Sequence, residues 1–282
     1  MVTFLDPAFD LIEDPEAVSA YDELPLWSAI FGNLLLEKVA MRPGLKVLDV
    51  GCGTGFPLIE LAQRLGPSCR LTGIDSWQLA LERAALKIKV FGLGNVELIH
   101  ADVSVYDWKG KKFDLIVSNL GMEHFGDFSK VIETCFKLSA PGAQAIITIC
   151  PKGVFREIYD VFEDTLIQMG LNHLLDDLNT YRASRLSLDE AAGRITQAGF
   201  AVQETVIRWH GIKYTDGTAL LHHCMVQYVF LDDWKQIIPI EIHNDFFRSL
   251  EKNLNSKASN EHGLYMSIPC GCIVARRPVP SS

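Results

Sequence analysis

Residues 47–57 read VLDVGCGTGFP, and this stretch decides the fold. Its first half is an apolar, β-branched run, which predicts a buried strand. The three glycines that follow are spaced G-x-G-x-G and predict a tight turn, against which a ligand can lie because no Cβ stands in the way. Pro57 suits the first turn of a helix. A buried strand, a glycine-rich turn and a helix start together indicate a nucleotide-type binding site.

The spacing of the glycines excludes two phosphate-binding motifs. The dinucleotide fingerprint G-x-G-x-x-G/A needs a small third residue, and counting from Gly51 that position is Phe56. The sequence also has no G-x-x-x-x-G-K-S/T loop, which excludes a phosphate-cradling ATPase. The glycines alone would also fit an ordinary tight turn, so the residues around them have to decide.

Strand-like and helix-like segments alternate from residue 44 to residue 150. Apolar and β-branched runs predict five strands, at 45–50, 70–74, 96–99, 113–118 and 145–149. Helical spacing with stop signals predicts helices at 57–65, 77–91 and 128–138, and Pro141-Gly142 reads as a turn. Units of this kind form parallel pairs with right-handed crossovers. The sequence therefore predicts an α/β fold with a doubly wound, mostly parallel sheet.

After residue 150 the pattern predicts two further strands with helices around them. The strands are expected at 200–208 and 264–275, which gives a seven-stranded sheet, and the helices at 154–169, 187–199 and over most of 216–258. Insertions that leave the carboxyl edge of a parallel sheet should cover the ligand site as helical lids. The expected organisation is an N-terminal arm and lid helix over 1–43, a cofactor-binding core over 44–150, and the remaining strands with substrate-covering insertions over 151–282.

Acidic residues stand at the ends of successive predicted strands. Asp75 ends the second strand and can accept hydrogen bonds from ribose hydroxyls. Asp102 follows the third strand, where an adenine amino group needs an acceptor. Asp49 lies at the end of the first strand, where it could instead organise the glycine turn by accepting N–H groups. Three acids beside a glycine-rich turn are hard to obtain from packing alone and favour a nucleoside ligand.

Four segments stand in the order and spacing of a known family: VLDVGCGTG at 47–55, LTGIDS at 71–76, HADV at 100–103 and FDLIVSNLGMEHF at 113–125. On these motifs the chain resembles the class I S-adenosylmethionine-dependent methyltransferases, of the small-molecule type found in quinone biosynthesis. The resemblance covers residues 44–150 well and the sheet up to residue 276 loosely. It implies a Rossmann-like methyltransferase fold, S-adenosylmethionine as the cofactor and S-adenosylhomocysteine as the product.

The resemblance also implies which residues bind the cofactor. Its methionine portion lies against Asp49, Gly51, Cys52, Gly53 and Gly55. Its ribose and adenine lie against Asp75, Ser76, Trp77, Asp102 and Val103. The sulfonium side lies over Asn119 and Leu120. A tryptophan at position 77 could instead pack its helix.

Methyl transfer from a sulfonium needs an aligned nucleophile and exclusion of water, and a base only where the acceptor must lose a proton. His124, in the loop after the fourth strand, is the candidate base because an imidazole titrates near neutrality; the alternative is that it caps or packs the loop. In similar enzymes an N-terminal helix, here expected at 28–41, covers the cofactor with an aromatic residue. Tyr21 is the candidate for this role, since an aromatic face or a phenol oxygen suits a cationic sulfur, and Trp27 is the second choice.

The formal net charge is −9, from 26 Lys and Arg against 35 Asp and Glu, which argues against a nucleic-acid partner. Eight of the acids and none of the Lys or Arg residues lie in residues 1–37. This segment is either a solvated arm or an acidic flap near a cationic ligand. The seven cysteines are scattered without a paired C-x-x-C spacing, so we expect reduced thiols and no metal site. No membrane span and no signal peptide is visible, which makes the cytoplasm the expected location.

The acceptor is the least defined part of the prediction. The apolar, aromatic composition of the lids favours an apolar or aromatic small molecule, and it permits a homodimer. Candidate pocket residues, which could also be core or surface positions, are Tyr159, Trp209, His210, Tyr214, His222 and His223. O-, N- and C-methylation stay open. So does a different class of function, a non-catalytic protein that binds S-adenosylmethionine or S-adenosylhomocysteine on the same fold.

Overall fold

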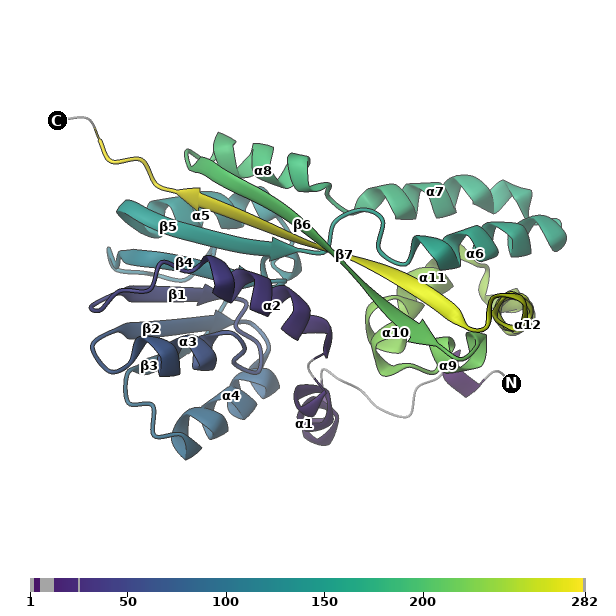
Figure 1. Ribbon diagram of the computed structural model, residues 1–282, viewed down its shortest axis with the longest axis horizontal. Coiled ribbons are helices and arrows are strands. Elements are labelled where there is room, and N and C mark those ends of the chain that lie inside the picture. Colours follow the sequence, from purple (N-terminus) through teal and green to yellow (C-terminus); the bar gives the residue numbers. More distant parts are fainter. Residues whose placement is uncertain (1–2, 6–12, 25, 281–282) are drawn as a thin grey trace. The chain divides into compact units, whose positions relative to one another are not determined.

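The computed structural model describes residues 3–5, 13–24 and 26–280. Within them lies a seven-stranded sheet (Figure 1). The strands are β1 (Lys46–Val50), β2 (Arg70–Asp75), β3 (Val96–His100), β4 (Phe113–Asn119), β5 (Ser139–Ile149), β6 (Ala201–Tyr214) and β7 (Leu264–Arg276). The seven predicted strands are all present, so the predicted α/β class is confirmed.

The strand order is β3-β2-β1-β4-β5-β7-β6. β1 is parallel to β2 on one side and to β4 on the other, and the pairs β2–β3 and β4–β5 are also parallel. β7 is antiparallel to β5. This is the doubly wound, mostly parallel sheet predicted from the sequence. The chain changes direction of winding between β1 and β4, and at such a switch point the loops diverge and leave room for a ligand.

Helices connect the strands and lie on both faces of the sheet (Figure 1). They are α1 (Pro15–Glu23), α2 (Leu26–Lys38), α3 (Leu58–Leu65), α4 (Gln78–Val90), α5 (Phe128–Leu138) and α8 (Leu188–Gln197). α3 packs on β2, α4 on β3, and α2 on β4 and β5. α8 begins with the predicted capping box: the Ser187 hydroxyl accepts the Glu190 N–H at 3.1 Å, and the Glu190 carboxylate accepts the Ser187 N–H at 2.6 Å.

The turn expected at Pro141-Gly142 is the clearest local error of the sequence prediction. β5 begins at Ser139 and includes both residues, and Gly142 has a φ of +76° inside the strand. The register with β4 jumps from the pair Phe113–Ser139 to the pair Leu115–Gln144. Pro141 and Gly142 therefore form an irregularity in the strand pairing and not a turn between elements. The same residue types occur in loops, so the sequence pattern does not distinguish the two.

Two further elements differ from the prediction. β6 runs on to Tyr214, beyond the expected end at residue 208, because alternation of half-exposed side chains continues through this edge strand. The helix α7 (Leu175–Ser184) was not predicted, since its polar composition buries only Leu178. Its first turn carries Asp176 and Asp177, which favour a helix N-terminus and were the available signal.

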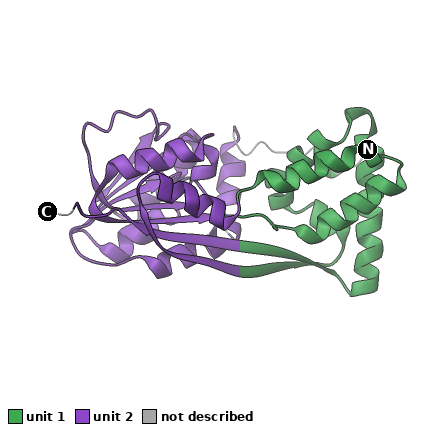
Figure 2. Ribbon diagram, turned by 90° about the horizontal axis from the view of Figure 1, so that it is seen from above, with its two compact units in different colours: residues 1–10, 151–186, 209–269 green, residues 11–150, 187–208, 270–282 purple. Residues whose placement is uncertain are grey.

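The chain divides into two compact units (Figure 2). Unit 2 comprises residues 11–150, 187–208 and 270–282, and unit 1 comprises residues 1–10, 151–186 and 209–269. β6 and β7 each contribute residues to both units. The other elements of unit 1 are helical: α6 (Arg156–Gln168), α7, α9 (Gly217–Leu221), α10 (Cys224–Val229), α11 (Leu231–Ile237) and α12 (His243–Glu261). Unit 1 thus holds the helical insertions expected after the fifth and sixth strands.

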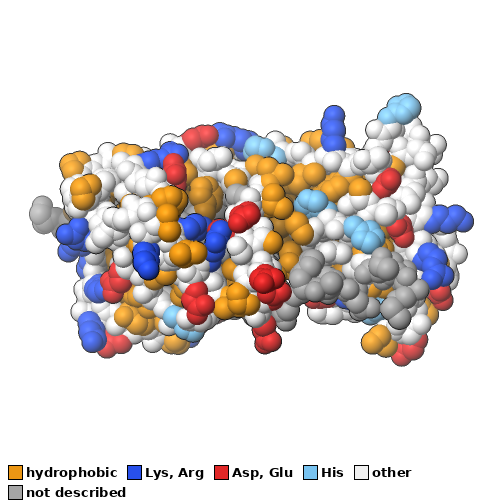
Figure 3. All heavy atoms as spheres, turned by 90° about the horizontal axis from the view of Figure 1, so that it is seen from below, with side chains coloured by type: hydrophobic (Ala, Val, Ile, Leu, Met, Phe, Trp, Pro, Cys, Tyr) orange, Lys and Arg blue, Asp and Glu red, His pale blue; other side chains and the backbone are white. Residues whose placement is uncertain are grey.

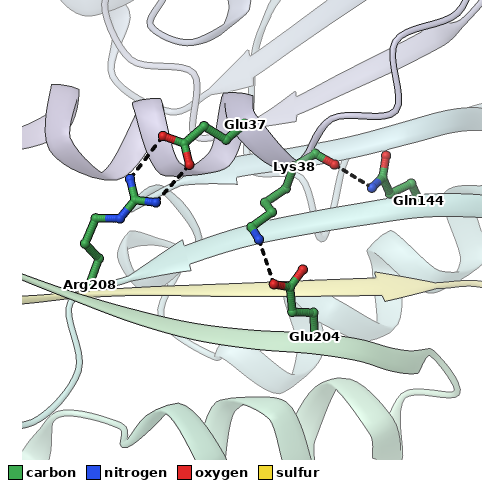
Figure 4. Close-up of polar contacts among 5 residues, drawn as sticks. All are labelled: Glu37, Lys38, Gln144, Glu204 and Arg208. Atoms are coloured by element: carbon green, nitrogen blue, oxygen red, sulfur yellow. Dashed lines mark hydrogen bonds and ion pairs between the residues drawn. The ribbon is translucent and has the colours of Figure 1, made fainter.

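Polar contacts fix the end of α2 against the sheet (Figure 4). The Arg208 guanidinium donates to both oxygens of Glu37, at 3.0 and 2.9 Å. Lys38 pairs with Glu204 at 2.6 Å. The buried Gln144 side chain accepts the Ala40 N–H at 3.0 Å and donates to the Lys38 carbonyl at 2.9 Å. α2 is therefore held by β5 and β6, which keeps its N-terminal half in a defined place over β4.

The seven cysteines are all free thiols, and only Cys224 is less than fully buried. Burial raises the pKa of Cys135, Cys270 and Cys272 to about 12, so these thiols stay protonated at neutral pH. They behave as small apolar side chains of the core. No helix in the described part of the chain is long and apolar enough to cross a membrane.

Candidate functional site

The glycine turn joins β1 to α3 at the carboxyl edge of the sheet. Its three glycines have positive φ angles, +72° at Gly51, +50° at Gly53 and +103° at Gly55, which side chains with a Cβ rarely adopt. The Gly51 N–H donates to the Ile74 carbonyl at 2.9 Å, which ties the turn to β2. A Cβ on Gly53 would meet no atom within 4 Å. The turn therefore presents bare backbone to open space at Gly53.

The turns after β1 and β4 are in close contact at the switch point. A Cβ on Gly51 would lie 2.5 Å from the Gly121 Cα, and one on Gly121 would lie 2.6 Å from the Val50 carbonyl oxygen. The buried Ser118 hydroxyl donates to the same Val50 carbonyl at 2.7 Å and accepts the Met122 N–H at 3.1 Å. Glycine is thus needed at both positions to let the two backbones approach.

Asp75, at the end of β2, lies against the glycine turn. Its Oδ2 accepts the Gly53 N–H at 2.7 Å, and its Oδ1 accepts the Trp77 N–H at 2.8 Å. Each carboxylate oxygen has a further lone pair, so the side chain can still accept two hydroxyl hydrogens. Asp75 thereby fixes the shape of the turn and keeps acceptor capacity for a ligand.

Asp49 is fully buried, and neither of its carboxylate oxygens has a hydrogen-bond partner among the described residues. Burial and the nearby charge of Asp75 raise its pKa to about 8, and the N–H of Leu58 offsets only part of the rise. Leu58 begins α3 directly after the glycine turn, so the alternative considered from the sequence, in which Asp49 organises this turn, stays a prediction. A buried, unpaired acid is costly, and folds retain one chiefly where a ligand interacts with it.

The raised pKa of Asp49 leads us to expect that the contribution of this residue to stability falls as the pH rises from 3.8 to about 8. In this range the folded state keeps the proton that the unfolded chain releases, so the free energy of unfolding falls with rising pH. Asp49→Asn, which cannot ionise, should lose most of this slope and melt above the wild type at the upper end. Thermal melts across the range test this, and a difference between the two proteins that does not grow with pH would contradict it.

The loop that leaves β4 carries a buried amide and a strained leucine. The Asn119 side chain donates to the Ser28 carbonyl of α2 at 3.0 Å and accepts the Thr148 hydroxyl at 2.8 Å. Leu120 follows with a φ of +63°, a conformation that is unusual for leucine and is often kept at functional sites. His124 ends the short 3-10 helix Met122–His124, and its imidazole is exposed with no hydrogen bond to the described residues.

The residues expected beside the adenine lie after β2 and β3. Trp77 is half-exposed and stands at the N-cap position of α4, and Ser76 is exposed. Asp102 accepts the Ser104 N–H at 2.7 Å. Val103 is fully buried, and its carbonyl accepts the Trp108 indole N–H at 3.1 Å. Cys52, in the glycine turn, is also buried. Its side chain therefore belongs to the core, and only its backbone groups are available to a ligand.

The N-terminal helix α1 reaches this edge of the sheet through two neighbouring residues. The rings of Tyr21 and Trp77 lie 6.2 Å apart and are tilted by 55°. Asp22, whose side chain is 9% exposed, pairs with Arg83 at 2.8 Å and with Lys87 at 2.6 Å on α4. Burial opposes ionisation, but Lys87, Arg83 and the hydroxyl of Thr54 in the glycine turn hold the pKa of Asp22 below its usual value.

Three other acids of the arm also have partners. Asp14 caps α1 by accepting the Glu16 N–H at 2.8 Å. Glu23 lies 3.5 Å from Arg83, and Glu37 holds Arg208. Two further acids, Asp6 and Asp10, lie outside the described residues. The negative charge of the arm is therefore partly neutralised by cations of the same unit.

The fold and this glycine-rich edge match a known family. A family model described as a methyltransferase domain matches residues 41–200, which is more than half of the chain. The chain belongs to this methyltransferase family. The methyltransferase uses S-adenosylmethionine as its cofactor and transfers the methyl group to a small molecule, as the sequence motifs predicted.

Individual relatives support the same assignment. A demethylmenaquinone methyltransferase of Geobacillus kaustophilus is 25% identical over 197 residues, which cover 67% of this chain and 82% of the relative. An S-adenosylmethionine-dependent methyltransferase of Aquifex aeolicus has a TM-score of 0.52 at 20% identity, over 68% of this chain and 92% of the other. Phosphoethanolamine N-methyltransferase 2 of Haemonchus contortus has a TM-score of 0.56 at 17% identity, over 98% of this chain and 59% of the other. Both structures share the fold.

The residues at the carboxyl edge of the methyltransferase fit its cofactor. The open space at Gly53 lets a ligand contact backbone, and the spare lone pairs of Asp75 suit two ribose hydroxyls. The buried carboxyl of Asp49 lies directly before the glycine turn. On the face drawn in Figure 3, lysine and arginine side chains lie scattered among acidic ones instead of gathering into one basic patch.

The lid residues of the methyltransferase named from the sequence have mixed environments. Tyr159 is buried, and Trp209 is 53% exposed beneath the guanidinium of Arg156 at 5.5 Å. His222 packs edge-on against the Phe4 ring at 5.4 Å. Among the residues that the structure describes, buried side-chain atoms without a hydrogen-bond partner occur at His210, Tyr214 and His223. No group of three or more His, Cys, Asp or Glu side chains in the described ranges is placed to hold a metal ion.

Sequence analysis missed two features of the methyltransferase. One is Asp22, which joins α1 to α4. The other is a group of arginines in unit 1, Arg156, Arg182 and Arg185, which line one cavity. The spacing of Arg182 and Arg185 near the end of α7 was the available signal, but without α7 in the prediction it could not be placed on a helix.

Proposed function

We propose that the methyltransferase binds S-adenosylmethionine at the carboxyl edge of β1, β2, β3 and β4, and methylates an apolar or aromatic small molecule. The observation that carries this proposal is Asp75, which accepts the Gly53 N–H and retains lone pairs for the ribose hydroxyls. The glycine turn and Cys52 would hold the methionine portion through backbone groups. The unpaired carboxyl of Asp49 would face the positive end of that portion.

The adenine would lie between the residues that follow β2 and β3. Trp77 and Ser76 would lie on one side of it, and Asp102 and Val103 would supply an acceptor and an apolar contact on the other. Asn119 and Leu120 would lie on the sulfonium side. Since the Asn119 amide is committed to Ser28 and Thr148, its part is to hold α2 and the β4 loop in place.

The cofactor supplies a methyl group already activated on a sulfonium, so the chain has to align the acceptor and exclude water. Tyr21, held beside Trp77 by the pairing of Asp22 with α4, would shield the cationic sulfur. His124 would accept the acceptor's proton, for which its exposed, unpaired imidazole on the β4 loop is suited. Helices of unit 1 would cover the acceptor.

The class of acceptor is supported by the relatives and by composition. The similar relative acts, by its name, on demethylmenaquinone, a quinone. Unit 1 is rich in aromatic side chains, including the buried residues Phe155, Phe162, Phe230 and Trp234. A homodimer and a cytoplasmic location are further parts of this proposal.

Titration calorimetry with S-adenosylmethionine tests the cofactor site, and saturable binding with a stoichiometry of about one per chain is expected. A labelled-methyl assay over pools of quinols, phenols, amines and aliphatic alcohols then tests the acceptor. Transfer confined to ring-containing compounds supports the proposal. Transfer confined to aliphatic amines or alcohols would overturn the acceptor class, and failure to bind the cofactor would overturn the site.

Replacing Tyr21 with phenylalanine is expected to weaken cofactor binding or turnover several-fold, because it removes the phenol oxygen but keeps the ring beside Trp77. Calorimetry and initial rates on the Tyr21→Phe variant measure the two effects separately. Trp27→Phe is a matched control, since Trp27 is buried against the Phe31 ring at 5.9 Å. Unchanged affinity and unchanged rate in the Tyr21 variant would remove this residue from the site.

A further inference from the structure

Unit 1 contains a cavity of about 200 Å³ that the methyl-transfer chemistry does not explain. Arg156 and Tyr159 reach it from the first turns of α6, and Tyr181 and Arg182 from the end of α7. Arg185, the residue that follows α7, completes the basic side of its wall. No acidic side chain stands among the described residues that line the cavity. Three guanidinium groups and two phenols therefore share one small space.

Two of the three arginines have acidic partners that are exposed or distant. Arg156 pairs with Glu157 at 3.3 Å, and its side chain is 64% exposed. Arg182 lies 3.7 Å from Glu163, a long and partly exposed pair that compensates little charge. The Glu157 carboxylate is also shared, because it accepts the Ser267 N–H at 2.9 Å and the Ser267 hydroxyl. The cavity thus gathers three guanidinium groups on its wall in a protein whose net charge is −9.

The two phenols add hydrogen-bond donors to this wall. The Tyr181 hydroxyl is buried beside the Tyr159 hydroxyl and the Arg185 guanidinium, and the Tyr159 hydroxyl accepts the Trp234 indole N–H at 3.4 Å. Burial raises the pKa of both tyrosines, so their hydroxyl hydrogens are retained at neutral pH. A protonated phenol beside a guanidinium is arranged to donate to an oxyanion.

The same wall offers flat surfaces. The Tyr159 and Tyr181 rings lie 6.0 Å apart at an angle of 66°, and the Arg182 guanidinium lies over the Tyr159 ring at 5.8 Å. Guanidinium planes and aromatic rings both stack on planar ligands. A cavity of about 150 Å³ is enough to hold benzene, so the present one has room for a single ring with a small charged group.

We propose that this cavity binds the oxyanion, a carboxylate or a phosphate, of a planar aromatic molecule, and that the methyl acceptor belongs to this class. Arginine forks would hold the oxyanion, the phenol of Tyr181 would donate to it, and the ring would lie on the aromatic wall. The second part of the proposal rests on the proposed methyltransferase function. The first part, binding in unit 1, does not.

Calorimetry on the full-length chain with benzoate, phenyl phosphate and benzamide tests the binding part. We expect benzoate or phenyl phosphate to bind at least about tenfold more tightly than the neutral benzamide, and the stronger of the two identifies the kind of oxyanion. Arg182→Gln should weaken the anion at least about tenfold and leave benzamide unchanged. Arg248→Gln, at an exposed position of α12 away from the cavity, is the matched control and should change nothing.

Equal affinity for the three compounds, no binding of any of them, or equal losses in the two arginine variants would overturn the cavity as an oxyanion site. Cofactor calorimetry on the same variants shows whether they are folded, because Arg182 is not among the residues proposed to hold the cofactor. A methyl-transfer assay with hydroxybenzoates against hydroxybenzamides tests the acceptor part. Preference for the acids, with a raised KM in Arg182→Gln, supports it, whereas equal or reversed preference overturns it. A failure to bind S-adenosylmethionine would instead overturn the proposed function and leave the binding result standing.

Discussion

Replacing Gly53 with alanine is expected to weaken S-adenosylmethionine binding roughly tenfold to a hundredfold while the protein stays folded. The φ of +50° at this residue is the first reason, since alanine pays about 1–2 kcal/mol for a left-handed conformation. The second reason is spatial: the new Cβ would meet no protein atom within 4 Å and would enter the space that the cofactor is proposed to occupy. Calorimetry of the Gly53→Ala variant measures the loss of affinity.

Gly66 provides a matched control for this experiment. It has a φ of +70°, and a Cβ there would also meet nothing within 4 Å, but it lies at the C-terminal end of α3. Gly66→Ala therefore also strains a backbone with a positive φ, without touching the proposed site. If both variants lost cofactor affinity equally, or if neither did, the glycine turn would not be the surface that contacts the cofactor.

Replacing Asp75 with asparagine is expected to have an effect at least as large, a loss of about a hundredfold or more in cofactor affinity. The carboxylate accepts the Gly53 N–H and the Trp77 N–H with different oxygens. An amide has only one acceptor oxygen, so one of these N–H groups loses its partner and the turn loses a fixed point. The negative charge and the lone pairs proposed for the ribose hydroxyls are lost in the same step.

Asp114 is the corresponding control for Asp75→Asn. Its side chain also accepts a backbone N–H, that of Lys46 at 3.0 Å, but at the beginning of β1 and β4, the opposite edge of the sheet. Asp114→Asn should change the melting temperature by a similar amount and leave cofactor affinity as it is. A similar loss of affinity in both variants would mean that Asp75 acts through the stability of the sheet alone.

The cofactor half of the fold was predictable from sequence because its signals are local. The glycine turn directly follows strand β1, and Asp75 ends the next strand after one helical crossover. A parallel sheet therefore places them at the same edge, independently of the rest of the chain. Even so, the sequence predicted Asp75 only as a partner of the ribose and not as an acceptor for the glycine turn. Its hydrogen bond to the Gly53 N–H depends on the register between β1 and β2, which pairs Asp49 with Gly73.

The rest of the site depends on contacts between distant residues. Asp22 pairs with Arg83 and Lys87, more than 60 positions away, and nothing in the sequence around Asp22 distinguishes it from the other acids of the arm. The arginine cavity in unit 1 likewise needs the packing of α6 beside α7, and α7 has too few apolar residues to be recognised. Both features follow from tertiary packing, where periodicity gives no information.

The burial of the cysteines has a consequence for observing motion in this protein. A thiol in the core can be alkylated only while its surroundings are transiently open, so its labelling rate reports the free energy of that opening. Cys52 lies in the glycine turn, Cys135 in α5, and Cys224 at the less protected start of α10. The alkylation rates of the native thiols therefore report local opening in each unit separately, without any engineered label.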